Sequence, residues 1–193
     1  TDRERTPEGF ELQFGTNHLG HFAFTGLLID RMIAVEGSRI VTVSSNGHWM
    51  PVAFDLDDIT ADGKYNRFVA YSRSKLANLL FTYELHRRLV AAGAETISLA
   101  SHPGGSDTEL ASHFPGAALS RRYLWFLVPY VAQPAAMGAL PSLRAATDPY
   151  ATGGQYFGPD GLGEMQGSPI VVRSSRRSQD RGLQARLWAL SEQ

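Results

Sequence analysis

Short apolar segments rich in β-branched residues alternate along this chain with longer segments of helical periodicity. The predicted strands are residues 39–45, 95–101 and 154–158. The predicted helices are residues 7–32, 68–92, 119–131, 134–147 and 179–191. The first helix is expected to begin at Thr6 and Pro7, an N-cap residue followed by proline at the first helical position. Crossovers of this length predict an α/β protein with a parallel sheet covered by helices.

The composition is that of a single globular domain over residues 1–193, with 43% hydrophobic and 19% charged residues. The net charge is −1, and no basic face is visible, so we expect no nucleic-acid partner. The chain has no cysteine, which excludes disulfides, thiol nucleophiles and thiolate metal sites. The lack of cysteine fits the cytosol, and we predict a cytoplasmic protein.

No segment resembles a transmembrane helix or a signal peptide. The richest apolar segment, residues 123–131, is shorter than the ~18 residues that a bilayer requires, and it contains Pro129. The chain begins with Thr1 rather than methionine, which suggests a fragment or a processed product.

Tyr71 and Lys75 are four residues apart within a predicted helix and therefore share one helix face. An ammonium in that position can stabilise a phenolate and lower the pKa of the phenol toward neutrality. Such a phenol is a usable general acid or base. The pair also arises by chance, and Tyr83 and Arg87 have the same spacing without an indicated role, so the motif alone is weak.

Polar, turn-rich segments follow the first two predicted strands, at residues 44–47 and 102–108. Chemistry in open parallel sheets takes place beyond the carboxyl ends of the strands. We therefore expect one cleft to contain Ser45, Tyr71 and Lys75 together with Thr108.

These segments together resemble the short-chain dehydrogenase/reductase family. The matching motifs, in order, are residues 16–22 (TNHLGHF), 39–45 (RIVTVSS), 70–78 (AYSRSKLAN) and 102–104 (HPG) with Thr108. The long gap between Ser45 and Tyr71 and the segment 153–159 (GGQYFGP) are similar to the branch of retinol dehydrogenases and protochlorophyllide-reductase-like proteins. The resemblance implies the C-terminal half of a doubly wound Rossmann fold, with three parallel strands and flanking helices.

The resemblance also implies catalytic roles. Tyr71 would exchange a proton with the substrate oxygen, and Lys75 would lower the pKa of Tyr71 and bind the nicotinamide ribose. Ser45, the second serine of its pair, would hold the substrate oxygen. Asn17 would hold a water that relays protons to Lys75, although an asparagine inside a helix can equally serve a backbone carbonyl.

The resemblance implies that the cofactor is NADP or NAD, with NADP slightly favoured. Pro103 and Gly104 would let the backbone approach the nicotinamide, and Thr108 would bond its carboxamide or the phosphates; a plain strand-to-loop break is the alternative for these residues. The substrate would be a small-molecule alcohol or ketone, apolar or bulky, under a lid at residues 111–131. A homodimer would be consistent with this family.

The glycine-rich turn that holds the pyrophosphate in this family is absent. The nearest string, residues 161–167 (GLGEMQG), has the wrong spacing and precedes Pro169 rather than a helix. We expect these residues alone to bind cofactor poorly, and the strand at 39–45 to have an unpaired edge. The alternative function is therefore a non-catalytic binding or structural module without a cofactor site.

Two other kinds of site are not supported by the sequence. His18 and His21 have a spacing seen at metal sites, but no third ligand of matching spacing is evident, so we predict no metal. A serine hydrolase would require Gly-x-Ser-x-Gly at a strand-to-helix turn, and residues 43–47 and 104–108 each lack one glycine.

Overall fold

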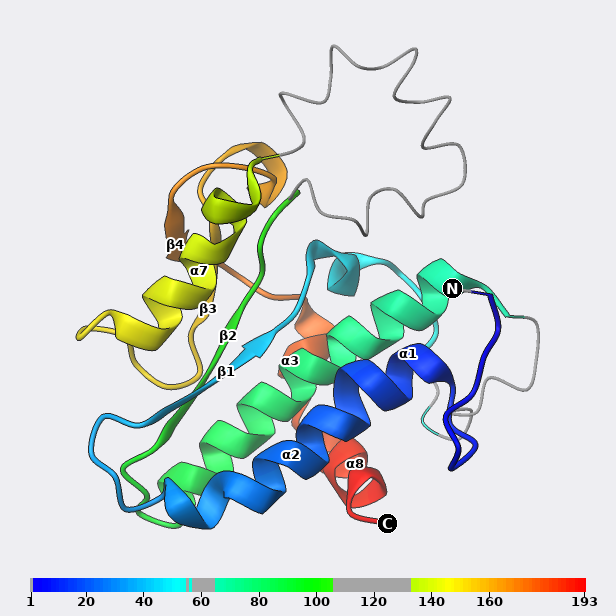
Figure 1. Cartoon of the computed structure of the whole chain (residues 1–193), viewed down its shortest axis with the longest axis horizontal. Helices are drawn as coiled ribbons and strands as arrows, with labels where there is room; N and C mark the ends of the chain where they lie inside the picture. Colours follow the sequence, from blue (N-terminus) through cyan, green and yellow to red (C-terminus); the bar gives the residue numbers. More distant parts are fainter. Residues whose placement is uncertain (1, 55, 57–64, 106–132) are drawn as a thin grey trace.

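The computed structural model describes residues 2–54, 56, 65–105 and 133–193. These form a four-stranded sheet in the order β1-β2-β3-β4 (Figure 1). The strands are β1 (Arg39–Val43), β2 (Ile97–Ser101), β3 (Tyr156–Pro159) and β4 (Pro169–Val171). β1, β2 and β3 are parallel, which confirms the predicted sheet, whereas β4 runs antiparallel to β3.

Helices cover both faces of this sheet, as the alternating pattern predicted (Figure 1). One face contacts α7 (Ala135–Thr147), and the other contacts α3 (Arg67–Ala91). α8 (Arg181–Ser191) packs on α3 from the side away from the sheet. The N-terminal helical run consists of α1 (Leu12–Phe14), the π-helical turn η1 (Gly15–Leu19), α2 (Gly20–Leu28) and the 3-10 turn η2 (Ile29–Arg31).

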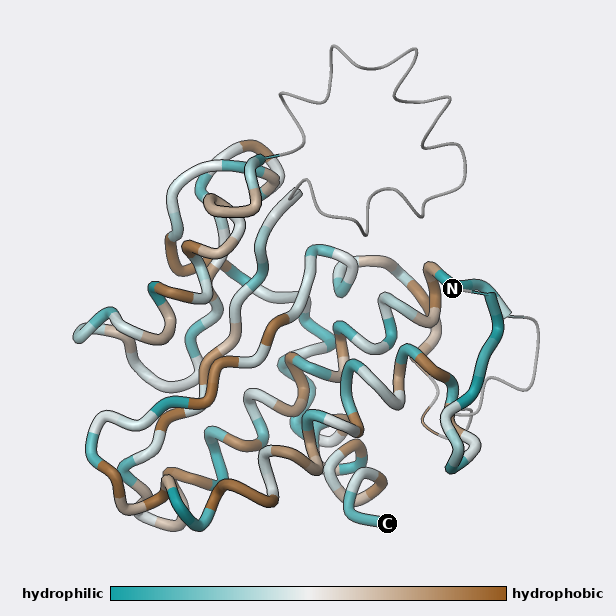
Figure 2. Tube along the Cα trace, viewed as in Figure 1, coloured by the Kyte–Doolittle hydropathy of each residue, from teal (hydrophilic) through white to brown (hydrophobic). Residues whose placement is uncertain are grey.

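Alternation along β2 divides the core between the two faces of the sheet. Leu99 packs with Phe157 and with Ala145 of α7, whereas Ala100 packs with Leu79 of α3. Successive residues of a strand point to opposite faces, so one short apolar strand can contribute to both layers. The hydrophobic residues of β1 and β2 accordingly lie between the helical layers (Figure 2).

Two boundaries differ from the sequence prediction. The first helix begins at Leu12, because residues 6–9 form a turn in which the Gly9 amide donates to the Thr6 carbonyl at 2.9 Å. The carboxylate of Glu11, rather than Thr6, accepts the first helical N–H groups. β1 ends at Val43 because Ser45 caps the 3-10 turn η3 (Asn46–Trp49).

β4 was not predicted. It has only three residues and begins at Pro169, and so short an edge strand gives no clear periodic pattern. The other predicted strands and helices agree with the structure to within a few residues, except that the helix expected at 119–131 lies outside the described residues.

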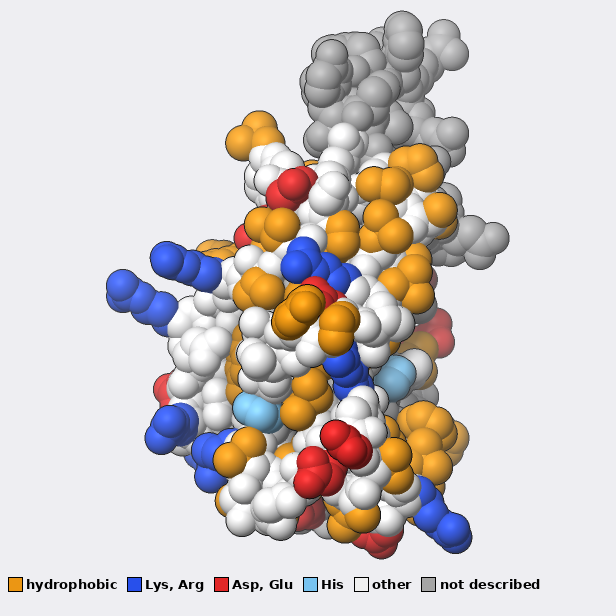
Figure 3. Space-filling view, turned by 90° about the vertical axis from the view of Figure 1, so that its left-hand side faces the viewer, with side chains coloured by type: hydrophobic (Ala, Val, Ile, Leu, Met, Phe, Trp, Pro, Cys, Tyr) orange, Lys and Arg blue, Asp and Glu red, His pale blue; other side chains and the backbone are white. Residues whose placement is uncertain are grey.

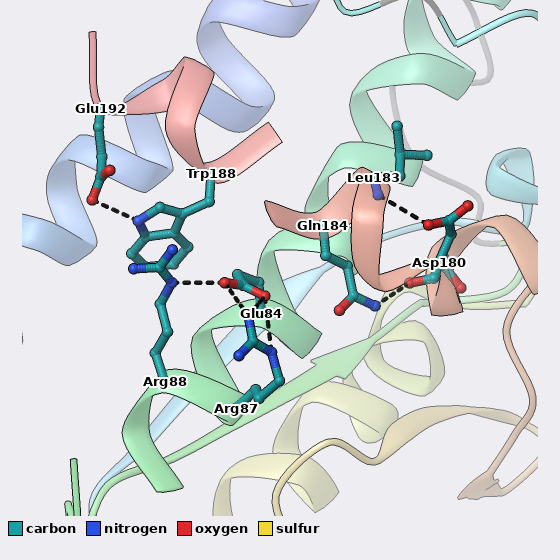
Figure 4. Close-up of polar contacts among 9 residues, drawn as sticks. Glu84, Arg87, Arg88, Asp180, Leu183, Gln184, Trp188 and Glu192 are labelled. Carbon is teal, nitrogen blue, oxygen red and sulfur yellow. Dashed lines mark hydrogen bonds and ion pairs between the residues drawn. The ribbon is translucent and has the colours of Figure 1, made fainter. Parts of the chain in front are cut away.

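The junction of α3 and α8 is built around a buried carboxylate (Figure 4). Glu84 has no exposed side-chain surface and accepts hydrogen bonds from Arg87 and, at 2.8 Å, from Arg88. The Arg88 guanidinium lies 4.2 Å from the ring centroid of Trp188 on α8. Because a buried charge is costly unless it is paired, these two arginines stabilise the Glu84 carboxylate, and Arg88 also links α3 to α8.

The face that carries α7 has basic, acidic and hydrophobic side chains interspersed, as expected for a chain of net charge −1 (Figure 3). Among the described residues, no helix is both long and apolar enough to cross a membrane.

Leu80 provides a test of the α3 core. It is fully buried among Phe14, Leu76 and Leu187, so Leu80→Ala is expected to lower the free energy of unfolding by about 2–5 kcal/mol in urea denaturation of the intact protein. Val90→Ala is the matched control, because Val90 lies on the same helix with 64% of its surface exposed and should change stability by less than about 0.5 kcal/mol. Equal losses from both variants would contradict the packing described here.

Candidate active site

Three of the predicted site residues, Ser45, Tyr71 and Lys75, meet where the carboxyl end of β1 faces the first turns of α3. α3 begins at Arg67, with the Asn66 side chain accepting from the amides of Phe68 and Val69. Tyr71 and Lys75 are half-buried and lie on one side of this helix, as their spacing predicted. The structure therefore brings Ser45 together with Tyr71 and Lys75, which lie 26 and 30 positions further along the chain.

Ser44 and Ser45 have different environments. Ser44 is buried, and its hydroxyl donates to the backbone carbonyl of Lys75 at 2.8 Å. Ser45 is partly exposed, its hydroxyl oxygen accepts the Gly47 amide at 3.1 Å, and this oxygen and the Tyr71 ring both lie beside Gly47. Ser44 thus fixes α3 to β1, whereas Ser45 is partly exposed and its catalytic role stays a prediction.

Burial raises the pKa of the Tyr71 phenol, and the neighbouring Ser45 side chain opposes this effect. The prediction that Lys75 lowers this pKa is not met. The Lys75 ammonium lies 5.6 Å from the centroid of the Tyr71 ring, and it donates to the Val43 carbonyl at 3.3 Å. The tyrosine ring packs on Gly47, where an added Cβ would lie 3.1 Å from a ring carbon.

Burial also lowers the pKa of the Lys75 ammonium. An ammonium has three N–H donors, and among the described residues Val43 accepts one of them. Asn78 donates to the same carbonyl at 3.0 Å, so the end of β1 holds both side chains in place. The remaining Lys75 donors are available to a ligand.

Asn17 lies in the π-helical turn η1, a local irregularity that often occurs at functional sites. Its side-chain amide donates to the Ser74 hydroxyl at 3.0 Å, and Ser74 in turn donates to the Tyr71 carbonyl at 2.8 Å. Asn17 and Lys75 line one groove. The structure therefore places Asn17 close to Lys75, whereas its catalytic role stays a prediction.

Pro103 and Gly104 follow β2 after His102, at the same carboxyl end of the sheet as the end of β1. Gly104 has φ +66°, and an added Cβ would lie 2.5 Å from the Met165 carbonyl, so only glycine fits this turn. Thr108 and the proposed lid at 111–131 lie outside the described residues.

A groove of about 420 Å³ runs along the free edge of β1. β1 has only one neighbour among the described strands, and the groove lies between this strand, the N-terminal helical run and α3. Its walls include Asn17, His21, Phe24, Leu28 and Met32 from the helical run, Arg39–Val43 from β1, and Lys75, Asn78 and Phe81 from α3. The groove is largely apolar, with Asn17, Lys75 and Asn78 among its polar groups.

The two histidines considered as metal ligands do not converge. His18 is buried beside Phe14 and Phe81, its Nε2 lies 2.9 Å from the Ser191 hydroxyl, and burial lowers its pKa to about 3. His21 is exposed and contacts the Thr16 carbonyl. The described part of the chain contains no group of three metal-binding side chains.

The site also lacks the geometry of a serine hydrolase in the residues described. His48 is the histidine near Ser45, but its Nδ1 lies 2.7 Å from the backbone carbonyl of Ser45, not from its hydroxyl. The other ring nitrogen accepts the Ser175 amide at 3.2 Å. Both nitrogens of His48 are therefore occupied by structural bonds.

Sequence reasoning missed three polar residues that connect the two strand ends: Asn46, Gln133 and Glu164. Glu164 lies in the segment 161–167, which the sequence excluded as a phosphate-binding turn and which in fact joins β3 to β4. The one signal was the clustering of glycines there, since close backbone approaches require glycine.

Curated proteins similar to this chain include several retinol dehydrogenases. Human retinol dehydrogenase 13 is 40% identical over 195 residues, which cover 96% of this chain and 54% of that protein. Human retinol dehydrogenase 11 is 34% identical, with 97% and 54% covered, and human polyprenol dehydrogenase is 33% identical, with 98% and 56% covered. The chain thus spans about half the length of the curated relatives that it matches.

A crystal structure of an uncharacterized protein from Mycobacterium paratuberculosis is also similar. It shares 42% sequence identity at a TM-score of 0.77, and the match covers all of this chain and 61% of that one. No family model matches the chain. The retinol and polyprenol dehydrogenase homologues nevertheless cover nearly every residue described above, and by this homology the chain belongs to the short-chain dehydrogenase/reductase family.

Proposed function

We propose that the intact protein is an oxidoreductase that transfers a hydride between NAD(P)(H) and an alcohol or carbonyl substrate. The observation that carries this proposal is the meeting of Ser45, Tyr71 and Lys75 at one strand end, in a chain homologous to retinol dehydrogenases. Each of the three residues is partly exposed.

Tyr71 is the proton donor in the carbonyl-reducing direction. Because burial raises its pKa, the phenol is protonated at neutral pH and can give its proton to the substrate oxygen. Ser45 holds that oxygen through its hydroxyl and stabilises charge that develops on it. Asn17 and Lys75, which line one groove, return a proton to Tyr71 through water.

The described residues fit the nicotinamide-ribose end of the cofactor. The Lys75 N–H groups that Val43 does not accept can bind ribose hydroxyls. The backbone of the Gly104 turn lies at the same carboxyl end of the sheet. When bound, the cofactor supplies or accepts the hydride. We propose NADP or NAD, with NADP slightly favoured, and an apolar alcohol or its carbonyl form as substrate, because relatives are named for retinol and polyprenol.

Tyr71→Phe tests the mechanism. Loss of the phenol proton should lower kcat/KM by about 10²–10⁴-fold in the intact protein, assayed with retinal and NADPH or NADH. The dissociation constants of the cofactors should change little, since the ring stays packed on Gly47.

Tyr83→Phe is the matched control for Tyr71→Phe. Tyr83 lies on the same helix, and its hydroxyl donates to Ser174 rather than to the site. This control should keep wild-type turnover. Retention of activity in Tyr71→Phe would overturn the proposed mechanism.

A second candidate function is a non-catalytic binding module, and the groove beside β1 favours it. The strand edge is unpaired among the described residues, and the neighbouring helical run exposes 61% of Phe24 and 82% of Leu27. Exposed apolar surface next to a free strand edge attracts another chain. Such a surface would bind a partner protein, a second copy of this chain in a homodimer, or another part of the same protein.

Light scattering after size exclusion tests whether this surface is used. Residues 1–193 produced alone are expected to self-associate, and Phe24→Ser should shift the population toward monomer by removing apolar area from the groove. Tyr150→Ser is the control, because Tyr150 is 87% exposed but does not line the groove. A wild-type chain that is monomeric at all concentrations would contradict self-association through the groove.

A further inference from the structure

The loop between β3 and β4 contacts both strand ends of the candidate site. We name residues 161–167 the brace loop. On one side, the side-chain amide of Asn46, next to Ser45, donates to the Gly163 carbonyl at 3.1 Å and the Glu164 carbonyl at 3.3 Å. On the other side, the Gly105 amide donates to the Met165 carbonyl at 2.7 Å. The brace loop therefore links the segment after β1 to the segment after β2.

A further link joins the side chains of His102 and Glu164. Nε2 of His102 lies 3.0 Å from a carboxylate oxygen of Glu164, and the histidine side chain has no exposed surface. The Gly104 amide donates to Nδ1 of the same ring at 3.3 Å, so the proton of a neutral imidazole is on Nε2 and points at Glu164. Burial lowers the pKa of His102 to about 4, so the contact at neutral pH is a hydrogen bond from neutral imidazole to carboxylate.

The surroundings leave this pair little freedom. An added Cβ at Gly158 would lie 2.0 Å from Nε2 of His102, so the imidazole fills space that only glycine provides. Tyr156 packs against the ring at a centroid distance of 5.1 Å. Glu164 itself has φ +56°, the one positive value among described non-glycine residues, a conformation that surrounding contacts must maintain.

Gln133 adds a parallel link and is also buried. Its side-chain amide donates to the Pro103 carbonyl at 2.9 Å, and its side-chain oxygen accepts the Gly167 amide at 3.1 Å. Its own backbone amide donates to the Gly105 carbonyl at 2.7 Å. The Pro103–Gly104 turn is thus held by the brace loop from two directions.

We propose that Glu164, acting through His102, is a positioning residue that holds the Pro103–Gly104 turn in the conformation that receives the nicotinamide. The chain of contacts runs from the carboxylate to Nε2, through the ring to Nδ1, and from there to the Gly104 amide. The nicotinamide part of this inference rests on the proposed function. The ordering of the turn by Glu164 is a property of the protein without cofactor.

Amide hydrogen exchange in the cofactor-free intact protein tests the ordering directly. In Glu164→Ala, exchange at Gly104 and Gly105 is expected to accelerate by about tenfold, since a hydrogen bond to a charged group is lost. Alanine has a Cβ, as glutamate does, so the steric constraint on this left-handed backbone position is the same in both proteins. Glu164→Gln keeps an acceptor oxygen and should restore most of the protection. Exchange equal to wild type in Glu164→Ala would overturn the proposal.

Leu162→Ala is the matched control in the same loop. Leu162 is 98% exposed, so its removal should leave exchange at Gly104 and Gly105 unchanged. If this control accelerates exchange as much as Glu164→Ala does, the effect belongs to the loop in general and the specific role of Glu164 is wrong.

Steady-state kinetics with NADPH and NADH, titrated separately, test the link to the cofactor. Glu164→Ala is expected to raise the KM of the cofactor that the enzyme uses by about 5- to 20-fold while kcat at saturation changes by less than about threefold. A residue with only a structural role would lower the melting temperature and leave this KM unchanged. Unchanged KM would overturn the positioning of nicotinamide.

The two proposals can fail separately. Faster exchange in Glu164→Ala, in a protein that transfers no hydride from either cofactor, would contradict the proposed function and the nicotinamide role but uphold the ordered turn. Hydride transfer with unchanged exchange and unchanged KM would uphold the proposed function and contradict the role of Glu164.

Discussion

The rest of the structure depends on how α3 attaches to the end of β1. Leu76, Leu79 and Leu80 have almost no exposed surface and fix which face of α3 points into the core. The Ser44 hydroxyl and the Val43 carbonyl then bond to the helix directly. Tyr71 and Lys75 acquire their positions from this attachment, because they lie on the part of the same helix that the core leaves partly exposed.

Burial shapes the chemistry of this site more than the neighbouring charge does. The Lys75 ammonium is directed to the Val43 carbonyl and lies over the Tyr71 ring, so desolvation dominates and the pKa of the phenol rises. A ligand that draws the ammonium toward its own oxygens would change that balance, since an opposite charge near the phenolate favours ionisation.

The groove and the brace loop are consequences of one sheet with two unequal edges. β1 exposes its edge to an apolar groove, whereas at the other edge the chain turns back and adds the short antiparallel strand β4. The return through β4 also brings the brace loop over the carboxyl ends of β1 and β2, where Asn46 and His102 bond to it. The brace loop and the three-residue strand β4 that follows it thereby connect the outer edge of the sheet to the candidate site.

The sequence by itself determined the parallel sheet, the helices on its faces and the pairing of Tyr71 with Lys75, because hydrophobic periodicity and helical spacing are local properties. The choice of Ser45 over Ser44 came from the family resemblance and stays a prediction. Only the tertiary structure decided the direction of the Lys75 ammonium, the helix start at Glu11 and the contact of Glu164 with His102. The ammonium direction and the histidine contact depend on distant segments and on burial. The helix start depends on how residues 6–9 turn. Hydrophobic periodicity contains none of this information.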